Sequence, residues 1–87
     1  MATVFEHVRL ALMELVAIPE AEVVPGAHLV EDLGIDSQDF VRIILHLEEV
    51  YSQEGRIIEI ADEELEGIET VQHVVSLLEG KLSAAGV

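Results

Sequence analysis

The 87-residue chain contains no cysteine and no tryptophan, only two phenylalanines and one tyrosine, and only four lysines and arginines. Without cysteine, neither a disulfide nor a thiolate metal site can form, so packing and helix capping must supply the stability. No uninterrupted apolar run exceeds four residues, whereas a membrane-spanning helix needs about 20. The first residues also lack the pattern of a secretory leader. We therefore expect a cytoplasmic protein that does not enter a membrane.

The few basic residues stand against eighteen acidic ones, which gives a net charge of -14. Such a charge repels the phosphates of nucleic acids and anionic lipid surfaces, so neither is expected as a partner. Protein partners should instead present basic patches. Acidity also keeps a small protein soluble, so the charge by itself does not identify a function.

The first third of the chain predicts one helix followed by a long loop. Apolar residues recur at helical spacing from Val4 to Val16, which is typical of an amphipathic helix. Pro19 and the pair Pro25-Gly26 then break the pattern until about Asp36, a connection of roughly eighteen residues where about 4 to 6 are usual. We expect this loop to pack on the bundle through its apolar members, which are Ile18, Val23, Val24, Leu29, Leu33 and Ile35.

A second helix is predicted to begin at Asp36 or Ser37, both good N-cap residues, and to end at Glu54-Gly55-Arg56. Its inward stripe has the three-and-four spacing of a buried helical face and comprises Phe40, Ile43, Ile44, Leu47, Val50 and Tyr51. The β-branched residues that follow have no second strand to pair with. We therefore expect an extended linker that fills the core through Ile57, Ile58 and Ile60.

The last part of the chain predicts a short and a longer helix. Asp62 is expected to cap an acidic turn through Glu66, and Thr70 to cap a final helix. The inward positions of that helix are Val71, Val74, Val75, Leu78 and Leu82. The sequence thus predicts a single all-α domain over residues 1–87, a small four-helix bundle of three main helices and one short helix, with a long first loop. We expect it to be monomeric.

One serine stands where a phosphate ester is favoured. Ser37 comes at the predicted start of the second helix, after a long loop and close to Gly34. Free amide hydrogens and the positive end of the helix dipole stabilise an anion at such a place. The same residues could also form an ordinary cap, and a lone capping serine is more often structural. The surrounding sequence decides between the two interpretations.

The segment Leu29-Val30-Glu31-Asp32-Leu33-Gly34-Ile35-Asp36-Ser37, followed by Leu47-Glu48-Glu49, resembles the acyl carrier protein family. The resemblance continues through Ile60-Ala61-Asp62-Glu63-Glu64 and Ile68-Glu69-Thr70-Val71-Gln72, so it covers nearly the whole chain. It implies that Ser37 carries a 4'-phosphopantetheine arm, transferred from coenzyme A by a phosphopantetheinyl transferase. It further implies that Asp36 assists metal binding during that transfer, and that the protein itself is a carrier without catalytic activity.

The outward stripe of the second helix is expected to dock partner enzymes. It places Val41 and Leu45 as exposed apolar residues in a charged surface that also includes Gln38, Asp39, Arg42, Glu48 and Glu49. The family docks basic patches of its enzymes on this helix, so the resemblance implies acyltransferases, ketosynthases or acyl-activating enzymes as partners. The acidic residues would steer association.

Three features depart from the common family pattern. Leucine usually follows the serine, whereas this chain has Gln38; Arg42 stands where an acidic residue is frequent; and the segment Ser52 to Glu59 is longer than usual. We therefore expect polyketide or related specialised biosynthesis rather than housekeeping fatty acid synthesis. One alternative is a peptidyl or aminoacyl carrier of nonribosomal synthesis, which Arg42 favours. The other is an unmodified acidic helical module that only binds proteins.

Other kinds of site find little support in the sequence. A calcium loop from Asp32 would require glycine at Ser37 and glutamate at Ile43. The histidines His7, His28, His46 and His73 are dispersed, so no metal site is predicted. No Gly-x-Ser-x-Gly elbow surrounds Ser37, which argues against a serine hydrolase.

Overall fold

The computed structural model describes residues 3–53, 55 and 58–85 of the chain. Three long α-helices form a bundle: α1 (Val4–Val16), α2 (Ser37–Gln53) and α4 (Val71–Ala85). A short helix, α3 (Asp62–Leu65), and a 3-10 turn, η1 (Glu20–Glu22), lie in the connections. The described residues contain no strand, only an isolated bridge between His28 and Thr70. The predicted all-α bundle of three main helices and one short helix is confirmed.

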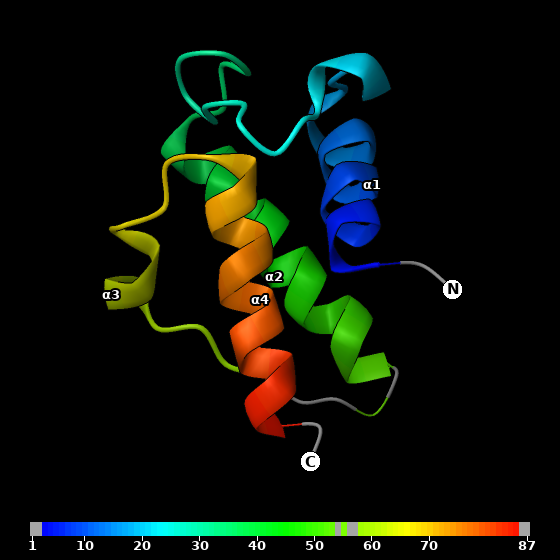
Figure 1. The fold of residues 1–87 in the computed structure, drawn as a ribbon, viewed down its shortest axis with the longest axis vertical. Coiled ribbons are helices and arrows are strands. Elements are labelled where there is room, and N and C mark those ends of the chain that lie inside the picture. The colour runs from blue at the N-terminus through cyan, green and yellow to red at the C-terminus, as the bar shows by residue number, and fades with distance from the viewer. Residues whose placement is uncertain (1–2, 54, 56–57, 86–87) are drawn as a thin grey trace.

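Helix α1 packs against both α2 and α4, and these three elements enclose the core. Figure 1 shows α4 in front of α2, α1 on one side and α3 on the other, with the first loop crossing the top. The predicted inward residues Ile43, Ile44, Leu47 and Tyr51 of α2 are buried, and all five predicted positions of α4 are buried. Phe40 and Val50, at the edge of the α2 stripe, are only partly buried. No helix in the described part of the chain is both long and apolar enough to cross a membrane.

The first loop belongs to the core, as its apolar residues predicted. Ile18, Val23, Leu29 and Ile35 are buried, and Leu33 is partly buried against the same cluster. Val24 is the exception, because 49% of its surface is exposed. The side chains of two successive residues in an extended segment point to opposite sides. Because Val23 points into the core, Val24 points to solvent.

Backbone hydrogen bonds tie the loop to the start of α4. The N–H of Leu29 donates to the carbonyl of Glu69 at 2.8 Å, and the N–H of Val71 donates to the carbonyl of Ala27 at 3.0 Å. The N–H of Gln72 also donates to Pro25 at 2.9 Å. The bonds from Val71 and Gln72 satisfy amides that the start of α4 otherwise leaves without partners. They also fix the long loop along much of its length.

The helix starts follow the predicted caps with one correction. The hydroxyl of Thr70 accepts the N–H of His73 at 3.3 Å, which confirms Thr70 as the cap of α4. Asp62 was expected to cap α3, but it is the first helical residue, and Ala61 stands at the cap. Alanine has no side-chain acceptor for the first amides of the helix, and the side-chain bond at this start is from the Ala61 N–H to the carboxylate of Glu64 at 3.1 Å.

The predicted end of α2 and the linker are described only in part. Helix α2 ends at Gln53, and Gly55 has a positive φ of 82° that favours glycine. Glu54, Arg56 and Ile57 lie outside the described residues. Ile58 is buried and Ile60 packs against the core, so the linker fills the bundle there as predicted.

Candidate functional site

Ser37 is the first residue of α2, and Asp36 caps the helix in front of it. The carboxylate of Asp36 accepts the N–H of Asp39 at 2.8 Å, and its carbonyl accepts the N–H of Phe40 at 3.0 Å. Gly34, with a φ of 66°, turns the loop into the helix in a conformation that L side chains rarely adopt. Of the two predicted caps, Asp36 therefore performs that role, and Ser37 is not needed for it.

The hydroxyl of Ser37 is consequently available for chemistry. Ser37 is exposed, and within the described part of the chain no hydrogen bond involves its side chain. The N–H groups of Ser37 and Gln38 likewise have no partner among the described residues. An anion attached to Ser37 would find these two amides and the positive helix end close by.

A small apolar pocket opens beside Ser37. Its volume is about 200 Å³, and it is lined by Leu29, Val30, Ile35, Asp36, Ser37, Phe40, Leu65 and Ile68. These residues come from the loop, the start of α2, and α3 with its following connection. The pocket thus lies between α2 and its neighbours in the bundle. It offers an apolar surface to whatever is attached to the serine.

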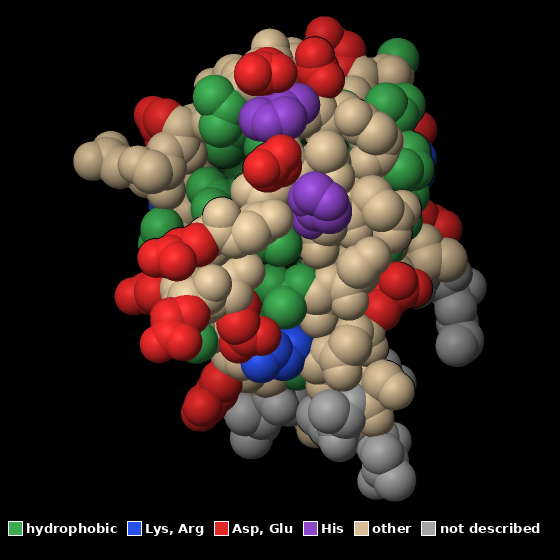
Figure 2. Space-filling view, turned by 60° about the vertical axis from the view of Figure 1, so that its left-hand side comes forward, with side chains coloured by type: hydrophobic (Ala, Val, Ile, Leu, Met, Phe, Trp, Pro, Cys, Tyr) green, Lys and Arg blue, Asp and Glu red, His purple; other side chains and the backbone are tan. Residues whose placement is uncertain are grey.

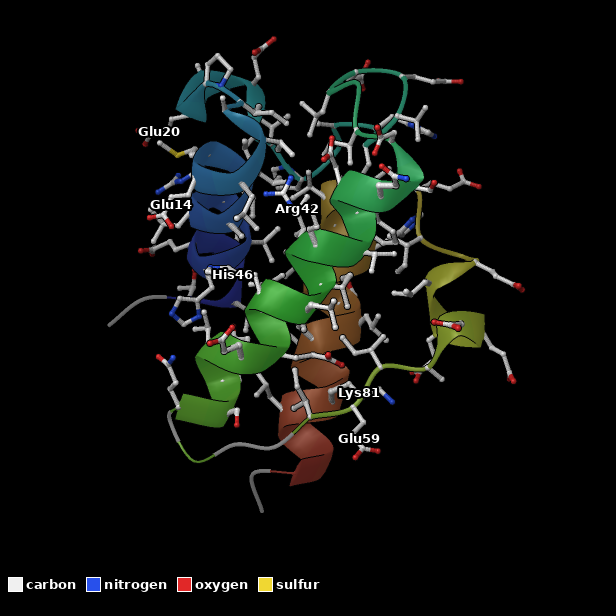
Figure 3. All side chains as sticks on the ribbon, turned by 180° about the vertical axis from the view of Figure 1, so that it is seen from behind. Glu14, Glu20, Arg42, His46, Glu59 and Lys81 are labelled. Atoms are coloured by element: carbon white, nitrogen blue, oxygen red, sulfur yellow. The ribbon has the colours of Figure 1, made fainter. Side chains whose placement is uncertain are left out.

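The outward face of α2 has the exposed apolar residues that its sequence predicted. Val41 is 47% exposed and Leu45 is 57% exposed. Gln38 and Glu49 are exposed as well. Arg42 forms an ion pair with Asp39 at 3.5 Å, yet its side chain remains 59% exposed. Figure 3 shows Arg42 on the face of α2 seen from behind, reaching toward α1.

Glu48 is placed differently from its expected outward position. It is partly buried, and its carboxylate accepts the N–H of Ile60 at 3.0 Å. The bond anchors the linker to α2 and satisfies an amide that no helix or strand would satisfy. Glu48 thus contributes to the structure of the linker. Sequence spacing alone could not show this contact, because it joins residues twelve apart across a connection of irregular length.

Lys81 of α4 holds α3 through a single close contact. Its Nζ lies 2.7 Å from Oε1 of Glu64, and Figure 3 shows Lys81 at the lower end of α4. The hydrogen bond from Lys81, together with that from the Ala61 N–H, holds the pKa of Glu64 below its ordinary value of 4.5. Helix α3 has no fully buried residue, so this ion pair is one of its main attachments.

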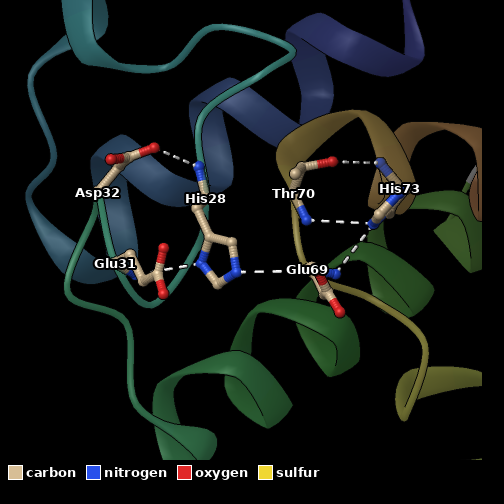
Figure 4. Close-up of polar contacts among 6 residues, drawn as sticks. All are labelled: His28, Glu31, Asp32, Glu69, Thr70 and His73. Carbon is tan, nitrogen blue, oxygen red and sulfur yellow. Dashed lines mark hydrogen bonds and ion pairs between the residues drawn. The ribbon is translucent and has the colours of Figure 1, made fainter.

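Two of the four histidines, His28 of the first loop and His73 of α4, lie on either side of Glu69 and Thr70 (Figure 4). His28 accepts the N–H of Glu31 at 3.1 Å, and His73 accepts the N–H groups of Glu69 and Thr70 at 3.0 and 3.3 Å. His28 Nε2 also lies 4.0 Å from a carboxylate oxygen of Glu69. Figure 2 shows histidine and acidic side chains gathered on one face. Among the described residues, no three side chains of the metal-binding types form a group that could hold a metal ion.

These histidine contacts were missed in the sequence. Each depends on a ring nitrogen that accepts a backbone N–H, and such contacts leave no periodic pattern. The four-residue spacings of His28 and Asp32 and of Glu69 and His73 were the available signals.

Comparison with known families adds the decisive observation. A family model described as the phosphopantetheine attachment site matches residues 6–78 of the chain. The chain belongs to that family. Its domains carry a covalent 4'-phosphopantetheine and serve as carriers, and they interact with phosphopantetheinyl transferases and biosynthetic enzymes. The resemblance to acyl carrier proteins agrees with this membership.

The local structure fits such an arm. An arm of this kind requires an accessible hydroxyl, donors for its phosphodiester and space beside the serine for the rest of the arm. The exposed Ser37, the amides of Ser37 and Gln38, and the pocket that ends at Leu65 and Ile68 meet these needs. When attached, the arm supplies a terminal thiol for thioester chemistry.

Proposed function

We propose that the chain is an acyl carrier domain over its 87 residues, with Ser37 as the attachment point of the arm. The observation that carries this proposal is the exposed Ser37 hydroxyl without a hydrogen-bond partner among the described residues, beside an apolar pocket. Membership of the phosphopantetheine attachment family supports it. The same membership argues against an unmodified module that only binds proteins.

In the proposed reaction, the Oγ of Ser37 attacks the β-phosphorus of coenzyme A within a phosphopantetheinyl transferase. The bond from the β-phosphorus to the bridging oxygen of the pyrophosphate breaks, and adenosine 3',5'-bisphosphate leaves with that oxygen. The proton of the hydroxyl passes to a base of the transferase, which also supplies Mg²⁺. Asp36 stands beside the hydroxyl and uses one carboxylate oxygen as the helix cap, so its other oxygen is in a position to assist metal binding.

We assign the cargo to polyketide or related specialised biosynthesis. The surface formed by Gln38, Val41, Arg42 and Leu45 supports this, because it combines exposed apolar residues with a cation five residues after the serine. Acyltransferase, ketosynthase or acyl-activating partners would contact this surface, and Asp39 and Glu49 would steer their basic patches. Arg42 is also the residue that favours the second candidate, a peptidyl or aminoacyl carrier.

The attachment site is tested by intact mass. Wild-type protein and Ser37→Ala are each incubated with coenzyme A, Mg²⁺ and a broad-specificity phosphopantetheinyl transferase. We expect the wild type to gain the mass of one arm and Ser37→Ala to gain none. A matched control is Ser76→Ala, which changes an exposed serine of α4 and should be modified like the wild type. Wild-type protein that stays unmodified, or a modified Ser37→Ala, would refute the proposal.

A further inference from the structure

The turn that precedes Ser37 is closed by a reciprocal pair of side chains. The backbone N–H of His28 donates to Oδ2 of Asp32 at 2.7 Å, and the N–H of Glu31 donates to Nδ1 of His28 at 3.1 Å. The carbonyl of His28 also accepts the N–H groups of Asp32 and Leu33 at 2.9 and 3.1 Å. Figure 4 shows both side-chain contacts on the loop, next to the start of α4. We call these two side chains the His28–Asp32 clamp.

The clamp closes a turn that leads directly into the serine. The N–H of Ile35 donates to the carbonyl of Leu29 at 2.9 Å, so the two ends of the turn meet. Leu29 is in turn bonded to Glu69 in front of α4. Asp36 and Ser37 follow at once, and Leu29 and Ile35 line the pocket beside the serine. The shape of this turn therefore sets where α2 begins and how Ser37 is presented.

We propose that His28 and Asp32 are positioning residues for the modification of Ser37, an inference that rests on the proposed function. Without the clamp, the N–H groups of His28 and Glu31 lose their acceptors within the turn. The turn then samples other conformations, and Ser37 spends less time in the geometry that a transferase needs. The residues act through the backbone and do not touch the reacting atoms.

The clamp also requires a neutral histidine. Nδ1 of His28 can accept the N–H of Glu31 only while it carries no proton, because both ring nitrogens of an imidazolium are donors. The carboxylates around the ring are those of Glu69, 4.0 Å from Nε2, and of Glu31 and Asp32 on the turn itself. Protonation would strengthen the contact with Glu69 and break the one with Glu31.

His73 offers a matched control. Its ring also accepts backbone N–H groups, those of Glu69 and Thr70. It lies on the other side of the bridge between His28 and Thr70, in α4, and makes no hydrogen bond with the turn. Its replacement removes the same kind of contact from the same region without opening the turn.

The test measures kcat and KM for arm addition by a broad-specificity transferase at saturating coenzyme A and Mg²⁺. Replacing His28 or Asp32 by alanine should lower kcat/KM about fivefold, the effect of losing roughly one hydrogen bond. His28→Asn and Asp32→Asn keep an oxygen near the place of the lost acceptor, so they should stay within about twofold of the wild type. His73→Ala should also stay within about twofold. Circular dichroism confirms that each variant is folded.

The asparagine variants supply a readout that a purely structural role of the ring or the charge would not give, because each restores an acceptor near the lost one without restoring the original side chain.

Several outcomes would overturn the positioning role: His28→Ala as fast as the wild type, His73→Ala as slow as His28→Ala, or no rescue by asparagine. If His28→Ala does not fold, the comparison of His28→Gln with His28→Asn decides, because glutamine carries its oxygen farther from the backbone and should be slow. A wild type that accepts no arm would refute the proposed function, whereas equal rates refute only the clamp.

Discussion

At the residue scale, the site separates two roles that the sequence places side by side. Asp36 holds the start of α2 through the N–H of Asp39, and Ser37 remains exposed without a hydrogen bond to any described residue. A serine that capped the helix would have its oxygen engaged with a backbone amide. Here the Ser37 hydroxyl oxygen is not used as a cap, because the Asp36 carboxylate already accepts the N–H of Asp39.

Two substitutions should therefore differ in their effect on stability. Asp36→Ala removes the cap and should lower the free energy of unfolding by about 0.5 to 2 kcal/mol. Ser37→Ala removes no hydrogen bond within the described structure, so its change should lie within about 0.5 kcal/mol. Urea denaturation followed by circular dichroism measures both. A larger loss for Ser37→Ala than for Asp36→Ala would contradict the assignment of the cap.

At the scale of elements, α3 is the most lightly attached helix. It is four residues long, has no fully buried residue, and depends on the ion pair between Lys81 and Glu64. The bond from Ile60 to Glu48 holds the linker just before it. Leu65 and Ile68, at the end of α3 and beyond, line the pocket beside Ser37. A change in the position of α3 would therefore change the width of that pocket.

This attachment predicts a pH dependence. Because the folded pKa of Glu64 is lowered, first by its bond to Lys81, the pair contributes stability above the ordinary value of 4.5 and loses it as pH falls through the lowered pKa. Lys81→Gln should move the Glu64 pKa back toward its ordinary value. A carboxyl carbon titration by NMR compares the two proteins. An unchanged Glu64 titration in Lys81→Gln would show that the ion pair is not the cause.

The elements were largely predictable from sequence, and the clamp was not. The spacing of Ile43, Ile44 and Leu47 fixes a buried helical face because helix geometry repeats regularly. The helix start at Ser37 could be located because capping residues and apolar periodicity mark it, whereas the pocket beside it could not. The contacts of His28 and Glu48 depend on how irregular segments cross in space, which no local period encodes. Val24 shows the same limit: it was expected to pack on the core but is exposed, because the side to which a loop residue points does not follow from a local pattern.

At the scale of the whole molecule, the net charge of -14 surrounds the site with a field that attracts basic partners. Arg9, Arg42 and Lys81 each face a carboxylate, those of Glu20, Asp39 and Glu64 respectively. Of these three cations, Arg42 is the most exposed and belongs to the surface proposed for docking. It would oppose an enzyme patch that is uniformly basic.

Partner choice should therefore respond to this one residue. Housekeeping enzymes of fatty acid elongation should turn over the loaded wild type poorly, and Arg42→Glu should raise their kcat/KM by about threefold or more at low salt. The gain should shrink near 0.5 M salt, where screening acts within about 5 Å. Arg9→Glu changes charge equally on α1 and serves as the control. Efficient turnover of the wild type, or an equal gain from Arg9→Glu, would count against specialised partners.

The bonds from Leu29 to Glu69 and from Val71 to Ala27 join two segments that are forty residues apart in the chain. Through these bonds the start of α4 supports the loop that leads to Ser37 at the start of α2, without a direct contact between the two helices being required. Because backbone groups make these bonds, a side-chain change such as His73→Ala leaves them in place, whereas Val71→Pro would remove one of them, since proline has no N–H. A change of that second kind would be felt at Ser37, while the docking surface on α2 stays as it is.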